Sequence, residues 1–406
     1  MAVRLIDQGL WSISVFALNI TAGLLLDTDL FAGLAVGSAI GFIGVAAARA
    51  WGTIAPVVVG AREGIAPEQA IHRGSSWTGA LLVAALCAGA TLAWLSFRVS
   101  AWNALIIAGV AALIVLSDFP RQILVIESRY RLALSTSVCY LVLSIASCLV
   151  VVAADEPELL IPLWAVSCLL TMVIGSVLSR DPLAVGRRPV AIAYAWRLTA
   201  EAFYIGVGGQ ISIILLYFVS DNEATSGIRF ANTLVFGPCF VLIQGLQPLV
   251  MKQIARIFDS GSAPVVRVGI RWCGLVAAIM LVVGSLAALI LATGLSESRL
   301  ALALPFLLPI GFGILTAQIF DAALLIVRFY SSPTLVHRFR LVSVVADVGA
   351  QIVGVTLDGA RGLLIAVVAA GAVRLVASGL LVSGRAVRDG VPRAEPAGSS
   401  AGSEAL

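Results

Sequence analysis

Charged residues are scarce in this chain of 406 residues, and their scarcity excludes a water-soluble globular protein. Only 12% of the residues are charged, whereas 60% are hydrophobic, and the mean hydropathy is +1.05. A soluble protein of this length could not cover so much apolar surface with so few charges. We therefore expect the chain to lie in a lipid bilayer.

The residue types that build most catalytic and metal sites are also rare. The chain holds two histidines, and its six cysteines lie in or beside apolar segments without metal-ligand spacing. No nucleophile, base or nucleotide motif is apparent, and no loop between apolar segments exceeds about 25 residues. We therefore expect no enzyme activity, no cofactor and no metal. The net charge of +4 gives no reason to expect a nucleic acid as a partner.

Long hydrophobic runs are abundant, and their lengths fit helices that cross about 30 Å of hydrocarbon. The alternation typical of a membrane β-barrel is absent. We expect an all-α polytopic membrane protein with about twelve transmembrane helices. In the second of these, Gly33, Gly37 and Gly41 recur every four residues and predict close packing of a neighbouring helix. The expected spans are about 8–26, 30–50, 75–97, 101–117, 133–153, 159–178, 199–219, 229–250, 269–293, 303–327, 341–357 and 362–383.

Basic residues are distributed unevenly between the two sets of loops that alternate along the chain. One set, together with the termini, holds most of the arginines, whereas the other is acidic and holds only Arg98, Arg229, Arg299 and Arg361. An excess of positive charge marks the cytoplasmic side of a membrane protein. We therefore expect a multi-pass protein of the cell inner (plasma) membrane with both termini in the cytoplasm.

A short pattern occurs twice and indicates a duplication. Asp27-Thr28-Asp29-Leu30-Phe31-Ala32-Gly33 and Asp221-Asn222-Glu223-Ala224-Thr225-Ser226-Gly227 begin 194 residues apart, each between two apolar segments. Both copies fall on the acidic side, which predicts two six-helix lobes related by a parallel pseudo-twofold repeat, typical of a transporter. A weaker echo joins Asp118, expected to begin the loop after the fourth span, to Asp321 near the end of the tenth.

The duplication and the central basic stretch predict the boundaries of the two lobes. We expect an N-terminal lobe at 1–180, a basic cytoplasmic linker at 181–198, a C-terminal lobe at 199–388 and a disordered cytoplasmic tail at 389–406. We interpret the two acidic copies of the pattern as equivalent hairpin tips rather than as substrate ligands.

Polar residues within the spans predict where the lobes face a shared cavity. An ionisable group at the centre of the bilayer costs about 2.5–3.5 kcal/mol, so it persists where it meets water, a partner or a substrate. In the eleventh span, Arg340, Ser343, Asp347 and Gln351 share one helix face. The candidate cavity residues are Asn19, Arg49, Glu201, Gln210, Asn232, Gln244, Gln318, Asp321, Asp347, Gln351 and Arg374.

Three of these candidates have a second interpretation. Asp347 and Arg374 lie about mid-span in neighbouring segments and fit either a structural ion pair or a site for a coupling ion or substrate. Arg49 fits a side chain that extends to the cytoplasmic surface. Both interpretations stay open from the sequence alone.

Several segments resemble polysaccharide-exporting flippases of the Wzx type. They cover roughly residues 5–260 and are Asp7-Gln8-Gly9-Leu10-Trp11-Ser12 with Asn19, Ala48-Arg49-Ala50 with Pro56-Val57-Val58-Val59-Gly60, Arg229-Phe230-Ala231-Asn232-Thr233-Leu234, Gly237-Pro238 and Leu246-Gln247-Pro248-Leu249. These flippases belong to the multidrug/oligosaccharidyl-lipid/polysaccharide (MOP) exporter superfamily, which also includes lipid II flippases and MATE multidrug extruders.

The resemblance implies both a mechanism and a cargo. The two lobes would work by alternating access and carry an undecaprenyl-pyrophosphate-linked oligosaccharide to the outer leaflet for surface polysaccharide biosynthesis. The implied partners are the lipid bilayer, the lipid-linked glycan, a polysaccharide polymerase and glycosyltransferases. The sequence departs from the pattern of these flippases in one respect. In the second lobe, Arg374 is the main mid-membrane cation available for pyrophosphate.

Two other functions stay open. A cation-coupled multidrug exporter of the MATE type would place acidic residues deep in the first lobe, and the expected spans hold none between Asp27 and Asp118. A non-transporting membrane scaffold of a glycan synthesis complex would tolerate alanine at Arg49, Asp347 and Arg374.

Overall fold

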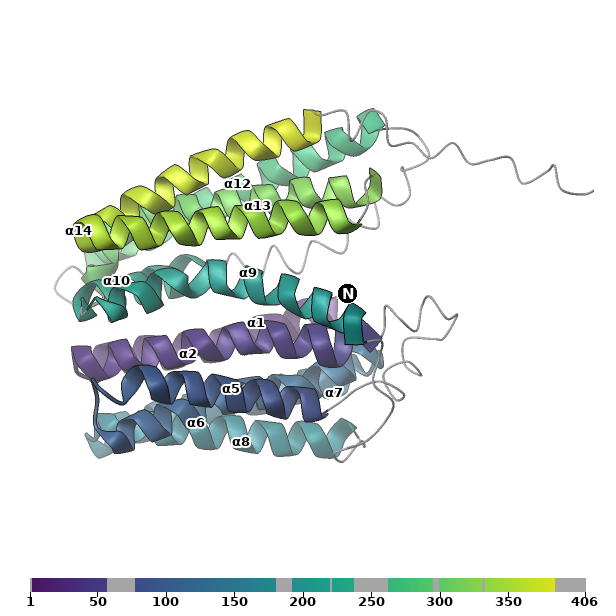
Figure 1. The fold of residues 1–406 in the computed structure, drawn as a ribbon. Coiled ribbons are helices and arrows are strands. Elements are labelled where there is room, and N and C mark those ends of the chain that lie inside the picture. The colour runs from purple at the N-terminus through teal and green to yellow at the C-terminus, as the bar shows by residue number, and fades with distance from the viewer. Residues whose placement is uncertain are drawn as a thin grey trace, which may run out of the picture.

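The computed structural model describes residues 2–56, 77–179, 192–219, 221–236, 262–294, 299–330 and 333–383, and within these residues the chain is helical and holds no strand (Figure 1). Short π-helical segments, η1 (Ala50–Ile54) and η3 (Asn232–Phe236), continue α2 and α10, and the 3₁₀ segments η2 (Pro157–Leu159) and η5 (Arg299–Ala303) precede α8 and α13. The helices are α1 (Ala2–Leu25), α2 (Thr28–Arg49), α5 (Trp77–Leu95), α6 (Ala101–Ile126), α7 (Tyr130–Ala154), α8 (Leu160–Ser179), α9 (Ile192–Phe218), α10 (Asn222–Ala231), α12 (Ser262–Gly294), α13 (Leu304–Tyr330) and α14 (Pro333–Ser383).

Ten of the described helical segments are long and apolar enough to cross a membrane. The last of them, α14, leaves the helical conformation at Asp358 and Gly359, so it forms two spans joined by a tight turn. The turn separates the expected spans 341–357 and 362–383. Apolar side chains such as Val142, Leu149 and Leu380 are exposed on the outside, as expected of helices that contact lipid. The expected all-α polytopic fold is confirmed.

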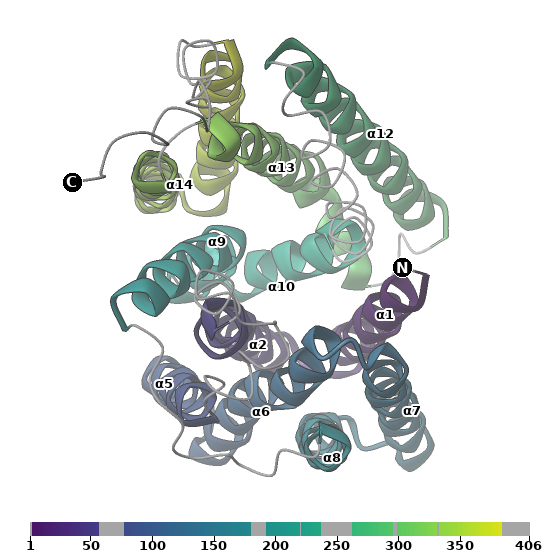
Figure 2. The same cartoon turned by 90° about the vertical axis from the view of Figure 1, so that its right-hand side faces the viewer.

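The helices form two bundles that lie side by side (Figure 2). The first bundle contains α1, α2 and α5 to α8, and the second contains α9, α10 and α12 to α14. Helix α2 of the first bundle packs on α9 and α10 of the second. The beginning of α1 and the described end of α14 lie at the same end of the molecule (Figure 1).

The two copies of the repeated acidic pattern occupy equivalent places in the two bundles. Asp27 is the N-cap of α2 and accepts a hydrogen bond from the Leu30 amide at 2.7 Å. Asp221 is the N-cap of α10 and accepts one from the Ala224 amide at 2.9 Å. An aspartate at this position satisfies an amide that has no partner within its helix. Each copy therefore starts the second helix of its bundle.

The glycine row of α2 packs against α6 as the spacing predicts. A Cβ added at Gly41 would lie 3.0 Å from the Ala111 carbonyl oxygen, and one added at Gly37 would overlap the side chain of Ile107. Nearly every residue of α2 from Leu30 onward is buried. Close backbone approach therefore places α2 at the centre of the first bundle, next to the second.

One expected boundary was wrong. Helix α6 continues to Ile126, so Asp118 lies within the helix rather than at the start of a loop. Helix α9 begins at Ile192, so residues 192–198 of the segment expected as a linker are helical, while the part of α9 that is apolar enough to cross a membrane begins at Thr199. The second part of the expected eighth span (237–250) and the expected tail at 389–406 lie outside the described residues.

Candidate substrate cavity

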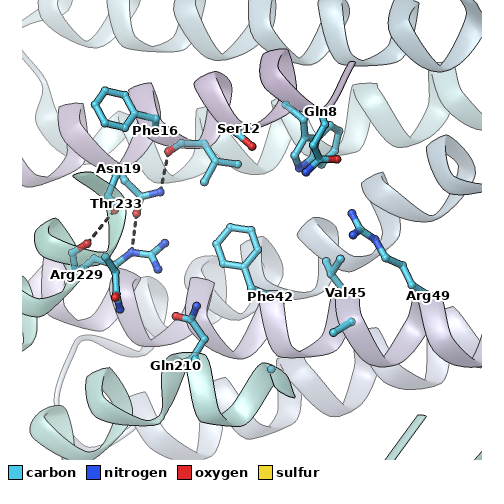
Figure 3. Close-up of a pocket in the computed structure, with 16 residues that line it drawn as sticks. Gln8, Ser12, Phe16, Asn19, Phe42, Val45, Arg49, Gln210, Arg229 and Thr233 are labelled. Atoms are coloured by element: carbon cyan, nitrogen blue, oxygen red, sulfur yellow. Dashed lines mark hydrogen bonds between the residues drawn. The ribbon is translucent and has the colours of Figure 1, made fainter. Parts of the chain in front are cut away.

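A cavity of about 250 Å³ lies where the two bundles meet. Its walls come from α1, α2, α9, α10 and η3 (Figure 3). Four of the residues expected from the sequence line this first cavity: Asn19, Arg49, Gln210 and Asn232. Aromatic side chains complete much of the wall, contributed by Trp11, Phe16 and Phe42.

Arg229 brings a buried positive charge to the first cavity. The residue is 4% exposed, and its guanidinium points into the cavity (Figure 3). Its Nε donates to Asn19 Oδ1 at 2.9 Å, and its Cζ lies 5.6 Å from the centre of the Phe42 ring. Among the described residues, no carboxylate forms an ion pair with Arg229. Since an unneutralised buried cation costs several kcal/mol, this arrangement favours an anion in the cavity.

Sequence reasoning missed Arg229 because the eighth span was expected to begin there. The charge was assigned to a loop on the acidic side, whereas α10 starts at Asn222 and carries Arg229 into the helix. The signal that could have located it is the N-cap Asp221, which places the helix start at Asn222, seven residues before Arg229.

Arg49, at the other end of the first cavity, belongs to a buried charge network. Its Nε and Nη2 donate to the two oxygens of Asp118 at 2.6 and 2.7 Å. Arg121, which is 1% exposed, donates to Asp118 Oδ1 at 2.8 Å and to Asp7 Oδ2 at 2.7 Å. Two arginines and two aspartates thus neutralise each other. Asp118 holds the guanidinium of Arg49, whose side chain is 28% exposed.

The two arginines of the first cavity lie at different depths. Asn222 Nδ2 donates to Asp29 Oδ1 at 2.7 Å, so α2 and α10 begin at the same level. Arg49 follows the N-cap Asp27 by 22 positions, whereas Arg229 follows Asp221 by 8. At 1.5 Å per residue, the difference corresponds to about 21 Å along the helix axes. Figure 3 shows the two side chains at opposite ends of the cavity.

A second cavity, of about 150 Å³, lies within the second bundle between α9, α13 and α14. Gly209 and Asn232 line both cavities, so the two spaces adjoin. A Cβ added at Gly209 would meet no atom within 4 Å, which leaves open space at this junction. The predicted residues that line the second cavity are Asn232, Gln318, Asp321, Asp347, Gln351 and Arg374.

The charges of the second cavity are paired. Arg374 Nη2 lies 2.7 Å from Asp347 Oδ1, and its Nη1 donates to the Gly313 carbonyl at 3.2 Å. Arg340 forms an ion pair with Asp321. The ion pair that the sequence suggested between Asp347 and Arg374 is confirmed in its geometry. The second cavity therefore presents polar groups with little net charge.

Among the expected residues that the structure describes, Glu201 lines neither cavity. Glu201 Oε1 lies 4.0 Å from the Nε of Arg340, beside the second cavity. Gln244 lies outside the described residues. Ser212, which lines the second cavity, donates to Gln351 Oε1 at 2.7 Å, and this bond joins α9 to α14. The polar face expected on the eleventh span is confirmed, since Arg340 and Ser343 line the cavity with Asp347 and Gln351.

Comparison with known proteins identifies the fold. No family model matches the sequence, and no curated protein matches it. An inward-facing MATE family multidrug resistance transporter of the MOP superfamily matches with a TM-score of 0.55 and 16% identity over 95% of each chain. A lipid II flippase, MurJ, in an inward closed conformation matches with a TM-score of 0.59 and 14% identity over 91% of this chain and 86% of the other. The chain has the fold of MOP transporters.

An outward-facing MATE family transporter also matches, with a TM-score of 0.57 and 16% identity over 95% of this chain and 94% of the other. The expected MOP-type fold is therefore confirmed over nearly the whole length. In this fold, the first cavity lies between the two bundles and the second lies inside one of them.

Proposed function

We propose that this chain flips a lipid-linked oligosaccharide from the cytoplasmic to the outer leaflet of the cell membrane by alternating access. The observation that carries the proposal is Arg229, a buried cation without an acidic partner among the described residues, in the cavity between two bundles of transporter fold. A guanidinium binds phosphate oxygens through two parallel hydrogen bonds. The group that we place there is the pyrophosphate linking lipid and sugar.

The second cavity suits the sugar part of such a cargo. It offers amides, hydroxyls and paired charges, including Gln318, Ser343 and Gln351, and these groups can exchange hydrogen bonds with sugar hydroxyls. Arg340 and Arg374 are each held by an aspartate, so we assign the anionic group to the first cavity. The lipid tail remains in the bilayer, because only the charged and hydroxylated parts need a polar path.

A cation-coupled drug exporter is the second candidate, because the matched structures include multidrug resistance transporters. Asp7 and Asp118 favour it, since both are buried acids within helices of the first bundle. Each is nevertheless bonded to an arginine, and Arg229 would repel a cationic drug. The lipid II flippase among the matched structures has a lipid-linked cargo by name, and the charge of the first cavity favours that class.

A membrane scaffold without transport activity would gain nothing from Arg229. An unneutralised buried cation lowers the stability of a protein, so it is retained where a ligand uses it.

We further propose the inner (plasma) membrane as the location, with both termini cytoplasmic, and a polysaccharide polymerase and glycosyltransferases as partners. An undecaprenyl-pyrophosphate glycan is the expected form of the cargo.

Deletion of the gene in its native host tests the proposal. Surface polysaccharide should be lost, and lipid-linked repeat units should accumulate facing the cytoplasm. Normal polymer in the deletion strain would contradict a flippase. Susceptibility of the same strain to cationic drugs separates the second candidate, since only a drug exporter predicts hypersensitivity with normal polymer.

A further inference from the structure

Arg98 connects the two bundles at the end of the molecule that carries Asp27 and Asp221. It lies in the turn between α5 and α6, and its Nη2 donates to the carbonyl of Phe218 at 2.7 Å. Phe218 is the last residue of α9, in the other bundle. The last carbonyls of a helix lack partners within the helix and carry partial negative charge, which attracts a cation. Arg98 therefore caps α9 from the first bundle.

Arg299 makes the reciprocal contact. It is the first residue of η5, which leads into α13 of the second bundle, and its Nη1 donates to the carbonyl of Leu26. Leu26 directly follows the end of α1 at Leu25, in the first bundle. Arg299 thus satisfies a carbonyl at the C-terminal end of a helix in the opposite bundle, as Arg98 does.

The two contacts are related by the duplication. Each arginine precedes the fourth helix of its bundle in the described order, α6 or α13. Each donates a hydrogen bond to a carbonyl at the end of the first helix of the other bundle, α9 or α1. Between them, the two copies of the acidic pattern touch through Asn222 and Asp29. Duplication of one contact therefore produces two equivalent links across the interface.

These links can open at low cost. Arg98 and Arg299 are exposed residues, and water can replace each of their hydrogen bonds to a carbonyl. The network of Arg121 is different, because its charges are buried and could not separate without leaving an unpaired charge. The contacts at the acidic end are therefore suited to repeated breaking and closing.

We propose that Arg98 and Arg299 form a pair of reciprocal latches that hold the acidic end of the two bundles closed, and that both release when the cavity opens toward that end. This proposal rests on the alternating access of the proposed function. Arg361 provides a matched control at the same end of the molecule. Its side chain is 84% exposed, and its Nε lies 3.9 Å from a carboxylate oxygen of Asp358, in the turn within α14, rather than near a residue of the other bundle.

Cross-linking between the two acidic loops tests the latches. In a chain whose native cysteines are replaced by serine, the pair Asp29→Cys and Asn222→Cys reports closure of this end, because the two side chains touch. The measured quantity is the rate of disulfide formation in the purified protein under mild oxidation. We expect about a fivefold lower rate for Arg98→Ala and for Arg299→Ala, and about a 25-fold lower rate for the double variant, since independent contacts add. Arg361→Ala should leave the rate unchanged.

A second cysteine pair within one bundle separates opening from loss of structure. Ser147 on α7 and Ser167 on α8 have hydroxyls 3.1 Å apart, so Ser147→Cys with Ser167→Cys should cross-link equally fast in every latch variant. Equal rates at the first pair for the Arg98, Arg299 and Arg361 variants would overturn the latches. Slowing of both pairs alike would also overturn them, because it would show general loosening.

The cross-linking assay contains no substrate, so its result does not depend on the proposed cargo. Slower cross-linking in a chain that flips no lipid would support the latches and refute the proposed function. Unchanged cross-linking in variants that still flip lipid-linked glycan would refute the latches alone.

Discussion

Replacing Arg229 with glutamine should have opposite effects on ligand binding and on stability. In the empty protein, Arg229 is a buried cation whose described partners are the amide oxygen of Asn19 and the ring of Phe42. In the loaded protein, the same charge faces an anion. Arg229→Gln keeps a hydrogen-bond donor for Asn19 but removes the charge, so it separates these two states.

The magnitude follows from Coulomb's law. A guanidinium and a phosphate about 4 Å apart attract by about 4 kcal/mol at an effective dielectric constant of about 20. Because the cavity admits some water, we expect a loss of about 2–3 kcal/mol, which is about 30-fold to 150-fold in affinity. Without ligand, removal of the unpaired charge should stabilise the fold by about 1–3 kcal/mol.

Farnesyl pyrophosphate is a suitable probe, because it carries the same lipid–pyrophosphate junction as the proposed cargo. Its affinity for the detergent-solubilised protein can be measured by calorimetry, and stability can be followed by thermal unfolding. Arg361→Gln is the control, because Arg361 is exposed and its ion-pair partner is Asp358 in the adjacent turn. An Arg229→Gln variant that binds the probe as the native protein does, or that unfolds at a lower temperature, would refute this reasoning.

Three further predictions concern the packing and the charge pairs. Arg121→Gln should lower the free energy of unfolding by about 3–5 kcal/mol, since it removes the shared partner of two buried carboxylates, and a rise in melting temperature would contradict this. Asp347→Arg and Arg374→Asp should each lower thermal stability, whereas the double exchange should recover at least about 1 kcal/mol in a double-mutant cycle; additive losses would exclude a direct pair. Gly41→Val should lower the free energy of unfolding by about 1–3 kcal/mol, measured by thermal unfolding, because the new side chain meets the backbone of α6. Gly89→Ala is the control and should have little effect, since a Cβ there meets no atom within 4 Å.

The sequence was sufficient for features that depend on local spacing. Apolar run lengths located the helices, including the break at Asp358 and Gly359. The three-and-four spacing placed Asp347 and Gln351 on one face, which lines the second cavity. The four-residue glycine spacing predicted close approach of a neighbouring helix to α2, and the structure shows that this helix is α6. Each of these features follows from the geometry of a single helix, so a single stretch of sequence suffices.

Features that depend on distant partners could not be predicted. Asp118 was assigned to a loop because a charge usually ends a span, but Arg49, 69 positions earlier, neutralises it within the bundle. The latches of Arg98 and Arg299 bind backbone carbonyls, and every residue carries one, so no sequence pattern identifies the partner. Long-range pairing is therefore what the sequence alone leaves open.

Flipping in reconstituted vesicles tests whether the chain carries a lipid-linked anion between leaflets and whether Arg229 serves that transport. The purified chain would be placed in liposomes with a fluorescent polyprenyl-pyrophosphate-linked oligosaccharide, and its transfer between leaflets followed by quenching of the outer leaflet. We predict transfer by the native chain and by Arg361→Gln at similar rates, and transfer at least about 30-fold slower by Arg229→Gln. Transfer by the native chain no faster than in empty liposomes, or equally fast by Arg229→Gln, would contradict the account.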